Sequence, residues 1–157
     1  MITTRLSDSV FKQGLALLPP GTVVDGFAIE GDFTSLSGEG PVLFVAAGIG
    51  ITPYRSLLLQ LSHEGRELSG GLLYAAPASE LLFLNELQES QQNNPDFSIE
   101  LLKDRRVTAA DILKRYADTM TLYLSGPSTM VDQLGRELIG VGIAEMYIKR
   151  DRFTGFK

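Results

Sequence analysis

The chain has 157 residues, a hydrophobic content of 44% and a formal net charge of −5. These values predict one globular domain, or one domain with part of another, and they argue against nucleic acid as a main partner, because phosphate contacts need a basic face. Without cysteine, disulfides and thiolate metal sites are excluded. With no signal peptide and no long apolar run, we expect a cytoplasmic protein without a membrane span.

The first forty residues are predicted to contain a short helix and a strand. An amphipathic run at residues 9–18 favours a helix that ends at a Pro-Pro-Gly stop. Residues 23–29 are typical of a strand. A polar, glycine-containing connector at residues 35–40 indicates a boundary, so we divide the chain into residues 1–40 and 41–157.

From residue 42 onward, apolar runs alternate with amphipathic helix patterns. The runs are mostly continuous apolar stretches that do not alternate with polar residues, which is typical of parallel strands covered on both faces. Thr52, Ser79 and Thr108 are predicted to cap the first three of these helices, and the fourth begins at Pro127. The predicted strands are residues 42–46, 71–76, 97–102, 121–124 and 145–149. This pattern predicts a doubly wound α/β domain with a five-stranded parallel sheet in the order 3-2-1-4-5.

The segment between the first of these strands and its helix has the spacing Gly48-x-Gly50-x-x-Pro53. A strand, a glycine turn and a helix start place backbone N–H groups against a phosphate. Pro53 replaces the third glycine of the usual dinucleotide motif and suits the first helical turn, where its missing N–H is not needed. The hydroxyl of Thr52 is a further candidate ligand of a pyrophosphate.

A second glycine-containing turn, Ser125-Gly126-Pro127, follows the fourth strand. In the predicted strand order the first and fourth strands are adjacent, so the two turns meet at the switch point, where ligands of such sheets bind. The alternative is that the glycines only make tight turns. We expect a dinucleotide to lie across Gly48, Gly50, Thr52, Gly126 and Pro127.

Three segments, in this order, resemble the nucleotide-binding half of the ferredoxin–NADP reductase superfamily. They are the first glycine turn, residues 122–131 and residues 151–156. The resemblance implies that NADP or NAD binds across the two turns. The residues it assigns to the nucleotide are Gly48, Gly50, Ile51, Thr52, Pro53, Gly126, Pro127 and Met130.

The same resemblance implies which residues lie near the reacting atoms. Ser125 stands at the position of the family's cysteine beside the nicotinamide and flavin, and serine keeps the size and a hydrogen bond but loses the polarisable sulfur. Asp151 stands at the family's acidic position, and Phe156 at its terminal aromatic. We therefore expect Ser125 and Asp151 to be catalytic in an NAD(P)H-dependent flavin oxidoreductase, which passes a hydride to FAD and electrons on to an acceptor protein or small molecule.

In the family, a flavin-binding β-barrel precedes the nucleotide domain. Residues 5–12 resemble the pyrophosphate-contacting helix at the end of that barrel, which makes Ser7 and Ser9 candidate FAD ligands; ordinary helix capping is the alternative. Residues 31–33 resemble the barrel's final turn. The family's Arg-x-Tyr-Ser/Thr strand is missing from the sequence. The resemblance therefore implies that residues 1–40 are a barrel remnant.

Two explanations of that remnant are a piece of a longer flavoenzyme and a naturally reduced relative, and we expect the former. In either case this chain should bind FAD weakly or not at all. An unpaired strand edge at residues 23–29 would pair with a second copy, which predicts a homodimer.

The sequence leaves the choice between NADP and NAD open, with a slight preference for NADP. Arg105 or Arg106, after the third strand, is a candidate for a bidentate contact with a 2′-phosphate. The alternative is a solvated loop in which Asp104 pairs with one arginine. The altered Ser125 and the missing flavin motif also keep open a second function, an NAD(P)-sensing or regulatory module that binds without turnover.

Overall fold

The computed structural model describes residues 3–26, 33, 36 and 40–153. Its centre is a five-stranded sheet in the order β3-β2-β1-β4-β5, and all four strand pairs are parallel. The strands are β1 (Val42–Ala47), β2 (Gly70–Ala76), β3 (Phe97–Lys103), β4 (Thr121–Pro127) and β5 (Ile148–Phe153). The predicted doubly wound α/β architecture and strand order are confirmed.

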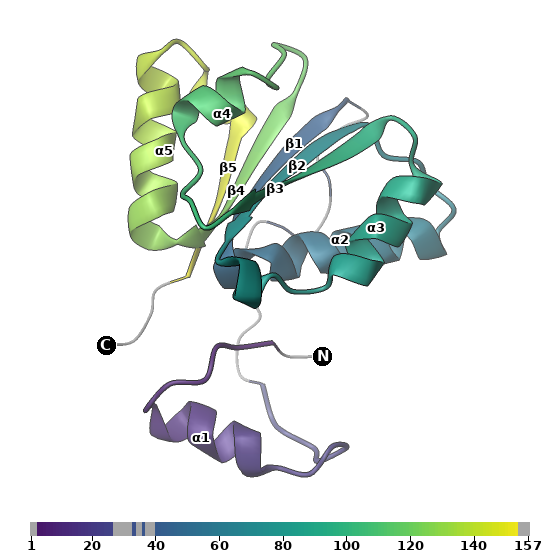
Figure 1. The fold of residues 1–157 in the computed structure, drawn as a ribbon, viewed down its shortest axis with the longest axis vertical. Helices are drawn as coiled ribbons and strands as arrows, with labels where there is room; N and C mark the ends of the chain where they lie inside the picture. The colour runs from purple at the N-terminus through teal and green to yellow at the C-terminus, as the bar shows by residue number, and fades with distance from the viewer. Residues whose placement is uncertain (1–2, 27–32, 34–35, 37–39, 154–157) are drawn as a thin grey trace.

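Helices cover both faces of the sheet, as Figure 1 shows. On one face lie α2 (Thr52–His63) and α3 (Leu84–Asn93); on the other lie α4 (Ala109–Leu113) and α5 (Ser128–Gly140). Phe44 in β1 packs toward the α2 side and Val45 toward the α5 side. This double burial explains why β1 is apolar at every position.

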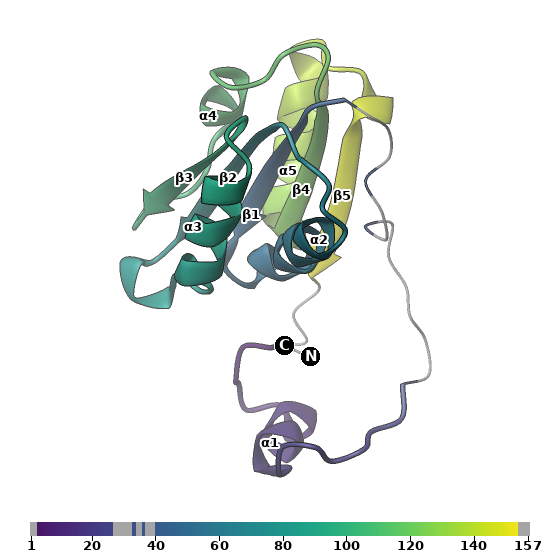
Figure 2. The same cartoon turned by 90° about the vertical axis from the view of Figure 1, so that its right-hand side faces the viewer.

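Helix α1 (Val10–Leu17) lies beyond the carboxyl edge of the sheet in both views (Figures 1 and 2). None of its residues is buried, and the apolar side chains of Val10 and Phe11 are largely exposed. Residues 23–26 form no strand, and residues 27–29 lie outside the described part of the chain. The homodimer expectation depends on an unpaired strand at residues 23–29, and the described residues of that range form no strand.

Three local predictions need correction. Residues 145–147 form a 3-10 turn, and β5 begins only at Ile148. Ser79 lies in another 3-10 turn, Ala78–Glu80, and α3 begins at Leu84 because Phe83 adopts a left-handed conformation with φ 59°. Thr52 does not accept a capping bond; its Oγ1 donates to the Ile49 carbonyl at 3.0 Å.

The predicted cap at Thr108 is confirmed and forms a capping box. The Asp111 N–H donates to Thr108 Oγ1 at 3.3 Å, and the Thr108 N–H donates to Asp111 Oδ2 at 3.0 Å. Two N–H groups at the start of α4 thereby gain side-chain acceptors.

The two predicted caps should differ in their effect on stability. Thr108→Ala is expected to lower the free energy of unfolding by about 1 kcal/mol, because the Asp111 N–H loses its side-chain acceptor and Asp111 Oδ2 loses the Thr108 hydroxyl. Ser79→Ala is expected to change it by less than about 0.5 kcal/mol, because an exposed serine with no capping bond is removed. Urea denaturation measures both values, and equal effects would contradict the assignment of the cap.

None of the helices within the described ranges is long and apolar enough to cross a membrane.

Candidate functional site

The two glycine turns pack directly against each other at the carboxyl edge of β1 and β4. A Cβ added at Gly50 would lie 2.3 Å from the Ser125 carbonyl oxygen and 2.8 Å from the Gly126 nitrogen. A Cβ at Gly126, whose φ is +154°, would lie 3.1 Å from the Cβ of Ala47. The expected meeting of the turns at the switch point is confirmed, and both glycines are needed for this close approach.

Gly48 has a different environment. It adopts a left-handed conformation with φ +53°, and an added Cβ would meet nothing within 4 Å. Gly48 opens the 3-10 turn Gly48–Ile51, which leads directly into α2. The first N–H groups of a helix have no intrahelical partner, so this open turn offers donors beside free space. That combination fits a pyrophosphate, which needs close backbone approach.

The other residues expected at the turns take different positions. Ile51 is fully buried in the core, so its backbone rather than its side chain is at the site. Pro53 and Thr52 are half-buried in the first turn of α2. Pro127 is exposed at the start of α5, and the Cε of Met130 covers Gly126.

Ser125 and Asp151 are brought together, as expected of a shared site. They are register partners on β4 and β5, and Ser125 Oγ donates to Asp151 Oδ2 at 3.4 Å. Ser125 is fully buried, while Asp151 is partly exposed at the edge of the sheet. The carboxylate therefore orients a buried hydroxyl and keeps a face toward solvent.

Tyr54 lies behind both turns, and the sequence reveals it only as one of the apolar positions of a helix. Its hydroxyl is within hydrogen-bond distance of the Val45 carbonyl (3.2 Å) and the Tyr123 carbonyl (2.7 Å), and the side chain is fully buried. Burial raises the pKa of Tyr54 well above its ordinary value, and the charge of Asp151 adds to the shift. The phenol thus stays a proton donor that links α2 to β1 and β4.

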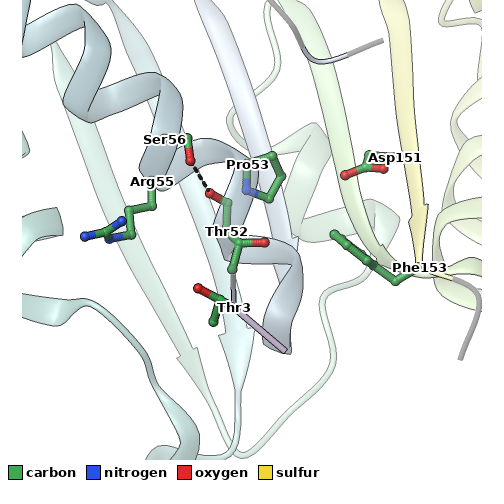
Figure 3. Close-up of a pocket in the computed structure, with 7 residues that line it drawn as sticks. All are labelled: Thr3, Thr52, Pro53, Arg55, Ser56, Asp151 and Phe153. Carbon is green, nitrogen blue, oxygen red and sulfur yellow. Dashed lines mark hydrogen bonds between the residues drawn. The ribbon is translucent and has the colours of Figure 1, made fainter. Parts of the chain in front are cut away.

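A cavity of about 330 Å³ opens beside the first turn of α2. Figure 3 shows Asp151 and Phe153 of β5 facing the residues of α2, with Thr3 next to Thr52. The sequence analysis missed Arg55 and Ser56, although their helical spacing from Thr52 places them on the same face. The lining residues are Thr3, Thr52, Pro53, Arg55, Ser56, Asp151 and Phe153.

Arg55 is held in place at this cavity by two neighbours. Its guanidinium lies over the ring of Phe83, 4.7 Å from the centroid, and its Nη2 donates to Glu86 Oε1 at 2.5 Å. The bond from Arg55 lowers the pKa of Glu86. The pair connects α2 to α3 and leaves a fixed cation at the rim.

The segment after β3 is arranged differently from the alternative suggested by the sequence. Asp104 does not pair with an arginine: it has φ +56°, and its Oδ1 accepts from the Ala78 N–H at 2.9 Å. Arg105 instead pairs with Asp111 through two hydrogen bonds of 2.7 and 3.1 Å, which holds the pKa of Asp111 far below its usual range. Arg106 is exposed.

The remaining candidates lie at or beyond the ends of the described chain. Ser7 is exposed, and its Oγ accepts from the Ser9 N–H at 3.4 Å. Ser9 precedes α1 and makes no side-chain capping bond. Phe156 lies outside the described residues. The described part of the chain contains no cluster of acidic and histidine side chains that could hold a metal.

Comparisons with known proteins agree with this geometry. A family model described as the oxidoreductase NAD-binding domain matches residues 44–135. The xylene/toluene monooxygenase electron transfer component XylA of Pseudomonas putida is 25% identical over 164 residues, which cover 87% of this chain and 47% of XylA. The chain therefore spans about half the length of this curated relative.

Solved structures share the fold. The cytochrome b5 reductase domain of Ulva prolifera nitrate reductase has a TM-score of 0.73 at 20% identity, covering 91% of this chain and 64% of that one. Ferredoxin–NADP⁺ reductase from Plasmodium falciparum has a TM-score of 0.59 at 19% identity, covering 73% and 52%. With the family model matching more than half of its length, the chain belongs to the oxidoreductase NAD-binding domain family.

Proposed function

We propose that this chain is the NAD(P)H-binding part of a flavin-dependent reductase. The observation that supports this most strongly is the packing of the two glycine turns at the switch point, with the open backbone of Gly48 beside them. Binding of NAD(P) fits the family, and the flavin reaction and the electron acceptor are properties of the whole protein that we infer from its relatives.

The roles of the residues follow from their positions. The backbone of Gly48–Ile51 and the first turn of α2 would hold the pyrophosphate, with Gly126 and Pro127 closing the other side. Ser125 and Asp151 form the polar pair at the reacting end, where Asp151 fixes the direction of the serine hydroxyl. When bound, the nicotinamide supplies a hydride and FAD accepts it. The chain itself contributes position and electrostatics.

The flavin would lie on the side of the N-terminal segment. We assign residues 1–40 to the flavin part of the protein, with Ser7 and Ser9 near the FAD pyrophosphate. The largely exposed apolar side chains of Val10, Phe11 and Leu17 in α1 support this, because a helix with no buried residue has packing capacity left for another element. The acceptor of the electrons would be a protein or a small molecule, by analogy with an electron transfer component.

Calorimetric titration of the full chain with NAD⁺ and, separately, with NADP⁺ tests the nucleotide site. We expect at least one to bind, and we expect Gly48→Ala to weaken its affinity by about tenfold, which corresponds to about 1.4 kcal/mol. The added methyl group would enter the free space at the turn.

Gly140→Ala, at the end of α5, is the matched control, because its Cβ also meets nothing within 4 Å but lies away from the turns. Unchanged affinity in Gly48→Ala would contradict the proposed site. An Arg-x-Tyr-Ser/Thr segment encoded upstream in the full gene would favour the flavin-dependent reductase over the sensing or regulatory module.

A further inference from the structure

The carboxylate of Asp111, at the start of α4, accepts hydrogen bonds from two residues, Thr108 and Arg105. Its Oδ2 accepts from the N–H and the hydroxyl of Thr108 at 3.0 and 2.8 Å. Both carboxylate oxygens also accept from Arg105, Nη1 to Oδ2 at 2.7 Å and Nη2 to Oδ1 at 3.1 Å. The Asp111 side chain is only 12% exposed, so it is fixed in place rather than free in solvent.

Arg105 lies where the adenosine end of a dinucleotide would be read. It follows β3, two strands away from β1, and the Asp104–Ala78 bond ties the carboxyl end of β3 to the segment after β2. In nucleotide-binding folds of this kind, an arginine near the ribose binds the 2′-phosphate of NADP, and an acidic side chain accepts a hydrogen bond from the free 2′-hydroxyl of NAD.

The fork of guanidinium N–H groups that would hold a phosphate already holds the Asp111 carboxylate. A phosphate would have to displace a carboxylate that two bonds from Thr108 keep in position, and it would approach two negative side chains, Asp111 and Asp104. Bidentate pairs of this kind are among the stronger hydrogen-bonded contacts in proteins. A free ribose 2′-hydroxyl carries no charge, so it neither has to displace the Asp111 carboxylate nor is repelled by Asp111 and Asp104.

We propose that Asp111 is a specificity-determining residue. It accepts the two guanidinium bonds with which Arg105 would bind a 2′-phosphate, and it thereby makes this chain prefer NAD over NADP. This inference rests on the proposed nucleotide site. It reverses the slight preference for NADP that the sequence suggests, because the arginine expected to read the phosphate is already engaged.

The test measures the affinity of the full chain for NAD⁺ and NADP⁺ in Asp111→Asn. Asparagine keeps an oxygen for the Thr108 N–H but loses the charge that holds Arg105. We expect the affinity for NADP⁺ to rise by about fivefold or more while that for NAD⁺ changes by less than about twofold. In Arg105→Ala/Asp111→Asn the gain should vanish, because no freed guanidinium remains.

Glu145→Gln is the matched control. It removes the same charge and another arginine pair, with Arg150, at the opposite edge of the sheet. An equal gain in this variant would overturn the proposal, since it would show an effect of net charge alone. An unchanged NADP⁺/NAD⁺ ratio in folded Asp111→Asn would also overturn it.

Arg105→Ala alone provides a second measurement that does not depend on the fold of Asp111→Asn. If Asp111 occupies Arg105, removing the arginine should change NADP⁺ affinity by less than about twofold, and a selective loss of fivefold or more would overturn the proposal. If the wild-type chain bound neither nucleotide, the proposed function itself would fail, which is distinguishable from either of these results.

Discussion

Gly50→Ala is expected to lower the free energy of unfolding by about 3 kcal/mol or more, the upper range for overpacking a close-packed interior. The added Cβ would lie 2.3 Å from the Ser125 carbonyl oxygen and 2.6 Å from its carbon. Both are backbone atoms of β4, a strand with hydrogen-bonded neighbours on each side, so they cannot move aside as a flexible side chain would. Urea denaturation of the purified variant measures the loss.

Gly48→Ala is the informative comparison, because it alters the same turn. Its φ of +53° costs a non-glycine residue about 1–2 kcal/mol, but the new methyl group contacts nothing. Stability should therefore fall mainly in Gly50→Ala, and both variants should lose nucleotide affinity. Equal stability of the two variants would contradict the close packing of the turns.

Tyr54→Ala is expected to lower the free energy of unfolding by about 4 kcal/mol, as for other fully buried aromatic side chains. The ring stacks on Phe44 with centroids 4.5 Å apart and also contacts Phe33 at 5.8 Å. Tyr54→Phe keeps the ring and should cost about 1 kcal/mol, because it removes only the donor to the Val45 and Tyr123 carbonyls.

The pH dependence gives a separate measure of Tyr54. A tyrosine whose pKa is raised in the folded state contributes stability that is present below its unfolded pKa of about 10 and lost as the pH rises through the folded value. The stability of the wild-type chain should therefore decline above about pH 10, and more steeply than that of Tyr54→Phe. Tyr74 also has a raised pKa, so the variant should retain part of the decline. Parallel curves for the two proteins would contradict this role.

Regular patterns made most of the fold predictable. β1 is read correctly from residue 42 because every position is apolar, and the strand order follows from the alternation of strands and helices. The meeting of Gly50 with Ser125 follows from that order alone, before any contact is known. The family resemblance assigns Ser125 and Asp151 to the site separately, and strand register places the two side by side.

The errors occur where a local conformation overrides the pattern. Phe83 takes a left-handed conformation that no composition rule anticipates, so α3 starts five residues after the expected cap at Ser79. Asp104 has a positive φ, and its Oδ1 accepts from the Ala78 N–H instead of pairing with an arginine. Arg105 pairs with Asp111. Tyr54 is a core position, as its helical spacing predicts, but that spacing carries no information about the bonds of its hydroxyl to the Val45 and Tyr123 carbonyls.

The central position of β1 has a consequence for synthesis. Val42 pairs with Gly70 on one side and with Thr121 on the other, so the strand made first in this sheet receives its second partner only after most of the domain has left the ribosome. Until then one edge of an entirely apolar strand has no ladder partner, which is the condition that invites association between nascent chains. Pairing of β4 covers this edge of β1, and α5 and β5 then complete the core on that side of the sheet.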